Sequence, residues 1–229
     1  MKIGIIGAGM IGGTLAKQLT ALGHEVSIAN SRGPETLREV AEETGARPVT
    51  VTEAGHAGEI VIISIPMLAV PHLPADLFSG VSDDVVVIDT GNYYPARDGR
   101  IEPIENGQAE TAWAAERLGR PLIKAFNNIA VQSLREKVRP KGDPSRIALP
   151  VAGDSPEAKE KAMNLVDELG FNPVDAGTLE DSWRQQPGTP CYGADLDAPR
   201  LKEALAAADH SRQADYRYQA NEAIRPYFE

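Results

Sequence analysis

Cysteine is almost absent from this sequence: Cys191 is the single one among 229 residues. One thiol excludes an internal disulfide and any zinc or iron–sulfur site held by several thiolates. A chain without disulfides suits a reducing compartment, so we expect the protein to be cytoplasmic. We also expect no metal site, because the histidines stand alone, without acidic neighbours at a ligand spacing: His24, His56, His72 and His210.

Long apolar runs and an excess of positive charge are missing too. No stretch reaches the roughly 18 consecutive apolar residues of a membrane-spanning helix. The chain passes directly from Met1-Lys2 into a short apolar segment, which predicts a strand rather than a signal peptide. Asp and Glu number 33 against 23 Lys and Arg, a formal net charge of −10. That charge disfavours nucleic acid and anionic membranes as partners, and we expect a small molecule instead.

What the sequence does contain is an alternation of strand and helix patterns, typical of an α/β fold with a mostly parallel sheet. We therefore expect a Rossmann, doubly wound arrangement. The expected strands are 2–6, 25–29, 49–51, 59–65, 85–89 and 121–126. The expected helices are 11–22, 34–44 and one that ends at Leu118, after a polar, glycine-rich stretch from Thr90 to about Gly107.

The pattern continues on a smaller scale after residues 139–146, which are rich in Pro, Lys, Gly and Asp. This break predicts a dinucleotide-binding Rossmann domain over 1–146 and a small C-terminal α/β extension over 147–229. The extension is short enough to continue the same sheet. Its expected elements are strands at 147–152 and 172–175 and helices at 157–169 and 198–224, the first of them capped by Ser155.

Residues 7–12, Gly7-Ala8-Gly9-Met10-Ile11-Gly12, match the pattern G-x-G-x-x-G. The pattern follows an expected strand and opens an expected helix, which is the context of a dinucleotide-binding loop. Gly7 permits the tight turn, Gly9 lets the backbone approach a pyrophosphate, and Gly12 allows the helix to pack closely on the strand. The pyrophosphate is then expected over the free amides of the helix N-terminus.

The position that separates NAD from NADP enzymes lies just after the second expected strand. NAD enzymes place an Asp or Glu there to bind the ribose hydroxyls. This chain has Asn30-Ser31-Arg32 instead. A carboxylate would repel a 2′-phosphate, whereas Ser31 and the Arg32 guanidinium can hold one through charge-assisted hydrogen bonds. The expected cofactor is therefore NADP(H).

Ligands of open α/β sheets bind beyond the carboxyl ends of the strands. This rule points to the residues that follow three expected strands. Pro66 cannot continue its strand, so it directs a loop across the cleft toward the nicotinamide. Asn127 is expected to contact the carboxamide or the second substrate, and Asn92 is a weaker candidate of the same kind. The candidates at this edge are Ser64, Ile65, Pro66, Asn92 and Asn127.

A dedicated acid–base residue is not evident. Lys124 and Asn128 have the K-x-x-x-N spacing of hydroxyacid dehydrogenases, in which the pair shares one face of a helix. Here Lys124 lies in an expected strand, so we interpret the spacing as accidental. Lys124 and Asn127 remain weak catalytic candidates. A hydride transfer between two planar rings needs no such residue, because the cofactors carry the chemistry.

The chain resembles the NADPH-dependent coenzyme F420 oxidoreductases over roughly residues 1–185. It is also similar to the cytosolic reductase domain of the STEAP metalloreductases and to the NADP-binding domain of the pyrroline-5-carboxylate reductases. The segments that carry the resemblance are the glycine loop, Asn30-Ser31-Arg32, Ser64-Ile65-Pro66, Lys124-Ala125-Phe126-Asn127, 151–159, Gly170-Phe171, 173–177 and Ser182-Trp183.

The resemblance implies hydride transfer between NADP(H) and a deazaflavin or flavin, with coenzyme F420, FMN and FAD as the candidate acceptors. It places the second ring in a cleft between the nucleotide domain and the C-terminal part. Ile65, Pro66 and Asn127 would then lie near the nicotinamide. Family members are often dimers, so we expect a homodimer. The segment 185–193 and the final helix match neither pattern, which leaves the acceptor open.

Two other functions stay open at this point. One is an NADPH-dependent reductase or dehydrogenase of a small carbonyl, hydroxyacid or imine, with Lys124 or Tyr93 as proton donor. Loss of turnover in Lys124→Ala with intact cofactor binding would favour it. The other is a protein that senses NADPH and catalyses nothing. Tight NADPH binding without turnover on any acceptor would favour it.

Overall fold

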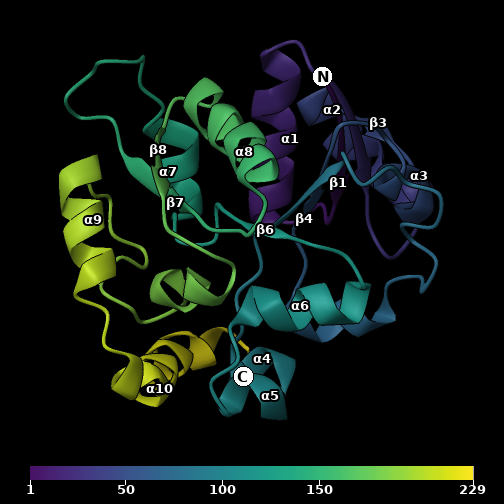
Figure 1. Ribbon diagram of the computed structural model, residues 1–229. Coiled ribbons are helices and arrows are strands. Elements are labelled where there is room, and N and C mark those ends of the chain that lie inside the picture. Colours follow the sequence, from purple (N-terminus) through teal and green to yellow (C-terminus); the bar gives the residue numbers. More distant parts are fainter. Residues whose placement is uncertain (229) are drawn as a thin grey trace.

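Six parallel strands form the main sheet, in the spatial order β3-β2-β1-β4-β5-β6 (Figure 1). The structure is a computed structural model and describes residues 1–228. The strand order reverses between β1 and β4, and doubly wound sheets bind ligands at such a switch point. The expected Rossmann-type α/β fold is confirmed. The strands are β1 (Lys2–Ile6), β2 (Glu25–Ala29), β3 (Arg47–Pro48), β4 (Ile60–Ile63), β5 (Val86–Asp89) and β6 (Ile123–Lys124).

Apolar side chains alternate between the two faces of this sheet, as the two-residue period of a strand requires. Ile60 and Ile62 of β4 belong to one buried cluster, and Val61 and Ile63 belong to the other. The first face is covered by α1 (Met10–Ala21), α2 (Arg38–Thr44), α7 (Val131–Glu136) and α8 (Pro156–Glu168). The opposite face is covered by α3 (Val51–Gly55), α5 (Glu102–Glu105) and α6 (Glu110–Leu118).

Two further strands, β7 (Ala148–Val151) and β8 (Asn172–Asp175), form a separate parallel pair. Two backbone hydrogen bonds of 2.8 and 3.0 Å between Lys124 and Ala152 join this pair to β6. Helix α8 packs against β5, β6, β7 and β8, so it covers both sheets. The division of the chain at residue 146 stays a prediction.

The C-terminal helices return to the N-terminal part of the chain. After α9 (Ala198–Ala206), α10 (Gln213–Ile224) lies beside α4 (Pro95–Asp98), as Figure 1 shows at the lower edge of the molecule. Within residues 1–228, no helix combines the length and the apolarity that crossing a membrane requires. Short 3-10 helices complete the chain: η1 (Pro34–Leu37), η2 (Met67–His72), η3 (Glu180–Gln185), η4 (His210–Arg212) and η5 (Arg225–Tyr227).

The third strand lies at Arg47–Pro48, just before the expected 49–51, because α3 begins at Val51. The Thr50 hydroxyl accepts a hydrogen bond from the Glu53 amide over 3.2 Å, and the Glu53 carboxylate accepts one from the Thr50 amide over 2.8 Å. This reciprocal capping box satisfies two amides at the start of α3. The apolar pair Val49 and Val51 fits a strand equally well, so only the cap distinguishes the two structures.

The single helix expected over 198–224 is wrong, because the chain turns between α9 and α10. The Asp209 carboxylate accepts hydrogen bonds from the amide and the hydroxyl of Ser211, over 2.9 and 2.7 Å. Such a local side-chain turn competes with helix continuation. The Tyr216 hydroxyl also accepts a hydrogen bond from the Asp209 amide over 3.3 Å. The turn directs α10 toward α4.

The strand expected over 121–126 is shorter than predicted. Phe126 is buried and has a φ of 62°, in the left-handed region that bulky residues seldom adopt. A strand cannot continue through this conformation, and β6 ends at Lys124. The sharp turn sets the direction of Asn127, which follows it.

Candidate functional site

The glycine loop, residues 7–12, connects the end of β1 to the start of α1, as predicted. Gly7 has a φ of 115°, and a Cβ there would lie 2.1 Å from the Ser64 carbonyl oxygen. A Cβ at Gly12 would lie 2.0 Å from the Gly7 carbonyl oxygen. Gly9 differs from both, since a Cβ there would meet nothing within 4 Å. The loop therefore packs tightly at Gly7 and Gly12 and leaves space for a ligand beside Gly9.

The N-terminus of α1 has the features of an anion site. Its N-cap residue is Gly9, no side chain caps it, and its first turn contains no acidic residue. The first amides of a helix have no acceptor within the helix, and the helix dipole favours negative charge there. The open space at Gly9 and these amides fit a pyrophosphate. Cofactor contact by Ala8, Met10 and Ile11 stays a prediction.

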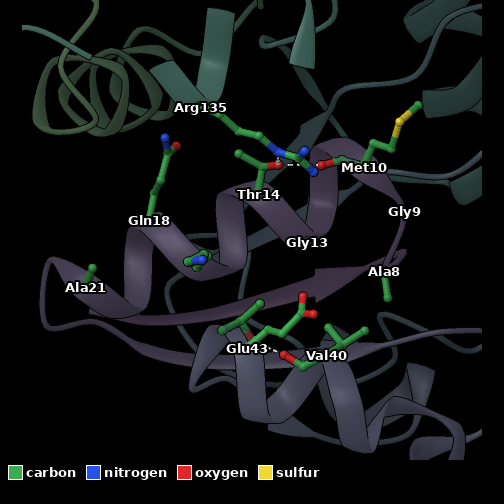
Figure 2. Close-up of a pocket in the computed structure, with 12 residues that line it drawn as sticks. Ala8, Gly9, Met10, Gly13, Thr14, Gln18, Ala21, Val40, Glu43 and Arg135 are labelled. Atoms are coloured by element: carbon green, nitrogen blue, oxygen red, sulfur yellow. Dashed lines mark hydrogen bonds between the residues drawn. The ribbon is translucent and has the colours of Figure 1, made fainter. Parts of the chain in front are cut away.

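A groove of about 870 Å³ extends from the glycine loop along α1 (Figure 2). Val40 and Glu43 of α2 face the groove from one side, and Arg135 of α7 faces it from the other. The groove includes Gly9 at one end, but Arg32 does not line it. It is therefore a different place from the expected 2′-phosphate site.

The expected 2′-phosphate loop follows β2 and is shaped by Asn30. The Asn30 Oδ1 atom accepts a hydrogen bond from the Arg32 amide over 3.0 Å, and its Nδ2 atom donates to the Thr36 hydroxyl over 2.9 Å. Ser31 and Arg32 are exposed at the tip of the loop. The Asn30 side chain thus holds the loop, while Ser31 and Arg32 are accessible to a phosphate.

The carboxyl ends of β4 and β5 are joined by short contacts. The Thr90 amide donates to the Ile63 carbonyl over 3.0 Å, and the hydroxyls of Thr90 and Ser64 are 3.0 Å apart. Ile65 is half-buried and Pro66 is exposed, immediately before η2 begins. This geometry brings the predicted residues Ser64, Ile65 and Pro66 to the carboxyl edge of the sheet, beside the glycine loop.

Asn92 and Asn127 lie next to each other at the same edge. The Asn92 Nδ2 atom donates to the Asn127 carbonyl over 2.8 Å, and the Asn127 Nδ2 atom donates to Asn92 Oδ1 over 3.0 Å. Gln185 completes the group, since its carbonyl and its Nε2 atom bind the Asn127 amide group over 2.7 and 2.9 Å. Asn127 is only 3% exposed and its amide is satisfied by protein, whereas Asn92 is half-buried.

Tyr94 and Tyr192 form a hydroxyl pair beside these amides. Their hydroxyl oxygens are 2.5 Å apart, and Asn92 Nδ2 lies 3.3 Å from the Tyr192 hydroxyl. Burial raises the pKa of both tyrosines, so both hydroxyls are protonated near neutral pH. The Arg97 guanidinium lies over the Tyr94 ring, 5.3 Å from its centre, and donates to the Asn92 carbonyl. The residues 92–97 are thus fixed against the C-terminal part.

Lys124 is fully buried in β6 beneath the asparagines. Its ammonium nitrogen lies 3.2 Å from Asp89 Oδ2 and 3.8 Å from Glu110 Oε2, and it donates to the Gly91 carbonyl. The position of Lys124 in a strand confirms that its spacing to Asn128 is not that of a helical pair. With its donors directed at Asp89 and Gly91, Lys124 holds the loop that carries Asn92.

Glu110 is a buried carboxyl at the first turn of α6. Burial raises its pKa to about 7, and the Lys124 ammonium partly opposes this rise. The Glu110 Oε2 atom has no hydrogen-bond partner within the residues described, and the Glu110 amide donates to Gln186 Oε1 over 3.2 Å. A buried carboxyl that titrates near neutral pH is typical of functional sites.

Tyr192, Gln185 and Glu110 also belong to the site, although no sequence motif pointed to them. Glu110 has the ordinary position of an acid in the first turn of a helix. Tyr192 and Gln185 come from the segment 185–193, which matches neither family pattern. Their partners are 100 and 58 residues away in the sequence, a distance at which no motif spacing applies.

The N-terminal part of the chain matches the model of a known protein family. The family described as coenzyme F420-dependent NADP oxidoreductase matches residues 2–93. The Escherichia coli K12 protein YjhV is 45% identical over 69 residues, which are 30% of this chain and 50% of YjhV. The chain thus matches half the length of this curated relative.

Two solved structures match most of the chain. A hypothetical protein of Sinorhizobium meliloti is 32% identical, with a TM-score of 0.72, over 86% of this chain and 95% of that one. A protein of Arthrobacter sp. FB24, described as a proposed F420-dependent NADP reductase, is 21% identical, with a TM-score of 0.65. That match covers 78% of this chain and 86% of the other, and at this identity it shows the fold alone.

Proposed function

Because this chain belongs to the family of coenzyme F420-dependent NADP oxidoreductases, we propose that it transfers hydride between NADPH and a deazaflavin or flavin ring. The family classes the chain as an NADP-dependent oxidoreductase. The observation that supports this function best is the pairing of an open glycine loop with a neighbouring loop in which Asn30, Ser31 and Arg32, rather than an acidic residue, directly follow β2. The first suits a pyrophosphate and the second a 2′-phosphate.

In this proposal the nucleotide extends over the carboxyl edge of β1 and β2. The amides that follow Gly9 hold the pyrophosphate, and Ser31 with Arg32 holds the 2′-phosphate. Ile65 and Pro66, which leave the sheet beside the loop, lie against the nicotinamide. When bound, NADPH supplies the hydride, and the protein supplies the alignment of two rings on which such a transfer depends.

The acceptor side combines neutral polar groups with one guanidinium, that of Arg97, which lies against Tyr94 and Asn92. Asn92 and the two tyrosines present amide and hydroxyl groups, and the charged residues Lys124 and Asp89 are buried below them. Amides and hydroxyls match the carbonyl and ring-nitrogen pattern of a deazaflavin or flavin. A deazaflavin such as coenzyme F420 is the acceptor we favour, with FMN and FAD as the other flavin-type candidates.

Reduction of a small carbonyl or imine is less well supported. The Lys124 ammonium is fully buried against Asp89, so a substrate bound at the carboxyl edge of the sheet does not reach it. Tyr93 is also fully buried. Its hydroxyl donates a hydrogen bond to the Glu105 carboxylate over 2.8 Å and accepts one from the Ile101 amide. Both residues have structural roles that leave neither of them a proton to donate to a substrate.

The test of the proposal is NADPH oxidation by the purified protein, followed optically with coenzyme F420, FMN and FAD offered separately. Rapid oxidation with one of them, and a much slower rate with NADH, is the expected result. Demonstrable NADPH binding without oxidation by any of the three would contradict the proposal. Carbonyl and imine substrates serve as the matched alternatives in the same assay, and turnover on these alone would favour the reductase function.

A further inference from the structure

Tyr192 ends a hydrogen-bonded chain that the binding of NADPH does not use. Its side chain is half-buried in the segment 185–193, and its hydroxyl contacts two donors, the Asn92 amide and the Tyr94 hydroxyl. Asn92 follows β5 at the carboxyl edge of the sheet, where ligands of this fold bind. The Tyr192 hydroxyl therefore lies beside the place that the acceptor ring would occupy.

The direction of the hydrogen bonds follows from the partners available. Tyr94 is only 8% exposed, and within the part of the chain that the structure describes its hydroxyl has one hydrogen-bond partner, Tyr192. The Tyr94 proton is therefore donated to the Tyr192 oxygen, because any other direction leaves a buried donor unsatisfied. The Asn92 Nδ2 atom can only donate, so it occupies a second acceptor position on the same oxygen.

A tyrosine hydroxyl has one proton to donate and at most two lone pairs to accept with. With both lone pairs engaged by Tyr94 and Asn92, the Tyr192 proton is left for a group outside this network. Tyr192 is also the more exposed tyrosine of the pair. The arrangement is that of a proton donor held in a fixed orientation.

We propose that Tyr192 donates a hydrogen bond, and then its proton, to the ring that receives hydride, with Tyr94 and Asn92 as positioning residues. This inference rests on the proposed function. In the balanced step, a hydride with its electron pair passes from the dihydronicotinamide to the acceptor ring, and a ring nitrogen gains the Tyr192 proton. A solvent proton then restores the Tyr192 hydroxyl.

Three groups set the electrostatics around Tyr192. The hydrogen bond from Tyr94 and the charge of Arg97 lower the pKa of Tyr192, whereas burial and the Glu110 carboxyl raise it, with burial the largest effect. The pKa remains above its ordinary value, so the hydroxyl keeps its proton at neutral pH until the acceptor ring takes it. Removing the Tyr94 hydroxyl takes away a lowering influence and is expected to move the alkaline limb of the pH–rate profile upward.

The first readout is equilibrium binding, which needs no turnover. Oxidised coenzyme F420 is titrated into the protein saturated with NADP⁺, in the wild type, Tyr192→Phe, Tyr94→Phe and the control Tyr218→Phe. Tyr218 is 66% exposed on α10 and lies outside the proposed site. Loss of one hydrogen bond is expected to weaken F420 binding about 3- to 10-fold in Tyr192→Phe, with no change in Tyr218→Phe.

The second readout is turnover. Loss of a general acid is expected to lower kcat on the order of 100-fold in Tyr192→Phe, while the Kd of NADPH stays within about 2-fold of the wild type. Tyr94→Phe is expected to fall between the wild type and Tyr192→Phe and to show the upward shift of the pH profile. This variant keeps the inference testable if Tyr192→Phe does not fold.

Two results would overturn the inference, and they differ from each other. Tyr192→Phe with the F420 affinity and kcat of Tyr218→Phe would remove the role of Tyr192 and leave the proposed function standing. A wild-type protein that neither binds nor reduces F420, FMN or FAD would remove the proposed function and this role together.

Discussion

The glycine loop is made of six consecutive residues, three between β1 and α1 and three in the first turn of α1. The polar cluster at the carboxyl edge of β5 and β6 instead draws its members from distant positions, namely Asn92, Tyr94, Glu110, Asn127, Gln185 and Tyr192. The loop depends on backbone conformation, with Gly7 at a φ of 115° and open space at Gly9. The cluster depends on side-chain hydrogen bonds among Asn92, Asn127 and Gln185. A change in the loop is therefore expected to act locally, and a change in the cluster to act through several elements at once.

The strongest expected effect separates two glycines of the loop. Gly7→Ala combines an unfavourable positive φ with a Cβ 2.1 Å from the Ser64 carbonyl oxygen, so we expect a loss of about 3–5 kcal/mol of folding free energy. Gly9→Ala meets no atom within 4 Å and is expected to cost less than about 1 kcal/mol. Urea unfolding of both variants measures this difference.

NADPH titration of the same pair completes the comparison. Gly9→Ala is expected to keep its fold and still bind NADPH at least about 10-fold more weakly, because the added methyl occupies the space proposed for the pyrophosphate. Wild-type affinity in a folded Gly9→Ala variant would show that the nucleotide does not lie over this residue.

The next effect concerns the polar cluster and depends on pH. The pKa of Glu110 is raised from 4.5 to about 7 by burial, so its ionisation opposes folding. The resulting loss of stability is absent below about pH 4.5, grows as pH rises and is complete above about pH 7. Glu110→Gln removes this ionisation. As the pH rises from 5 to 8, the unfolding free energy of Glu110→Gln minus that of the wild type is therefore expected to increase by roughly 2–3 kcal/mol.

Urea unfolding of the wild type and Glu110→Gln at the two pH values measures this change. The exposed acid Glu116 offers a matched control, since Glu116→Gln lies on the same helix and is expected to show no such trend. An equal pH trend in both variants would mean that Glu110 does not titrate in the neutral range.

The smallest of the three effects returns to the nucleotide side. Arg32→Ala is expected to weaken NADPH binding by about 1.5–3 kcal/mol, the scale of a hydrogen bond to a charged group, and to leave NADH binding unchanged. Fluorescence titration with the two nucleotides measures both values in one preparation. An equal loss of affinity for NADPH and NADH would mean that Arg32 contacts a part of the nucleotide other than the 2′-phosphate.

The sequence was sufficient to predict the nucleotide side of the fold. Gly7, Gly9 and Gly12 are separated by fixed short spacings, so a strand, a turn and a helix can be inferred from local residues alone. The buried strand around β4 was predictable for a similar reason, since its apolar run requires cover on both faces. Lys124 was correctly placed in a strand from its apolar neighbours.

The acceptor side was not predictable in the same way. The contact between Tyr192 and Asn92 joins positions 100 residues apart, a separation at which no motif spacing applies. The displacement of the third strand from the expected 49–51 has a related cause, because a short apolar segment fits a strand or a helix until the Thr50 cap is considered. Long-range side-chain contacts and local caps, rather than periodicity, decided these regions.

The most direct test of the account follows the hydride itself. NADPH with deuterium at both C4 positions of the nicotinamide is incubated with the protein and oxidised coenzyme F420 in ordinary water, and the reduced acceptor is examined by mass spectrometry and NMR. The account predicts one deuterium at carbon 5 of the reduced deazaflavin ring. NADPH oxidation that leaves the acceptor unlabelled, or no oxidation at all, would contradict direct transfer between the two rings.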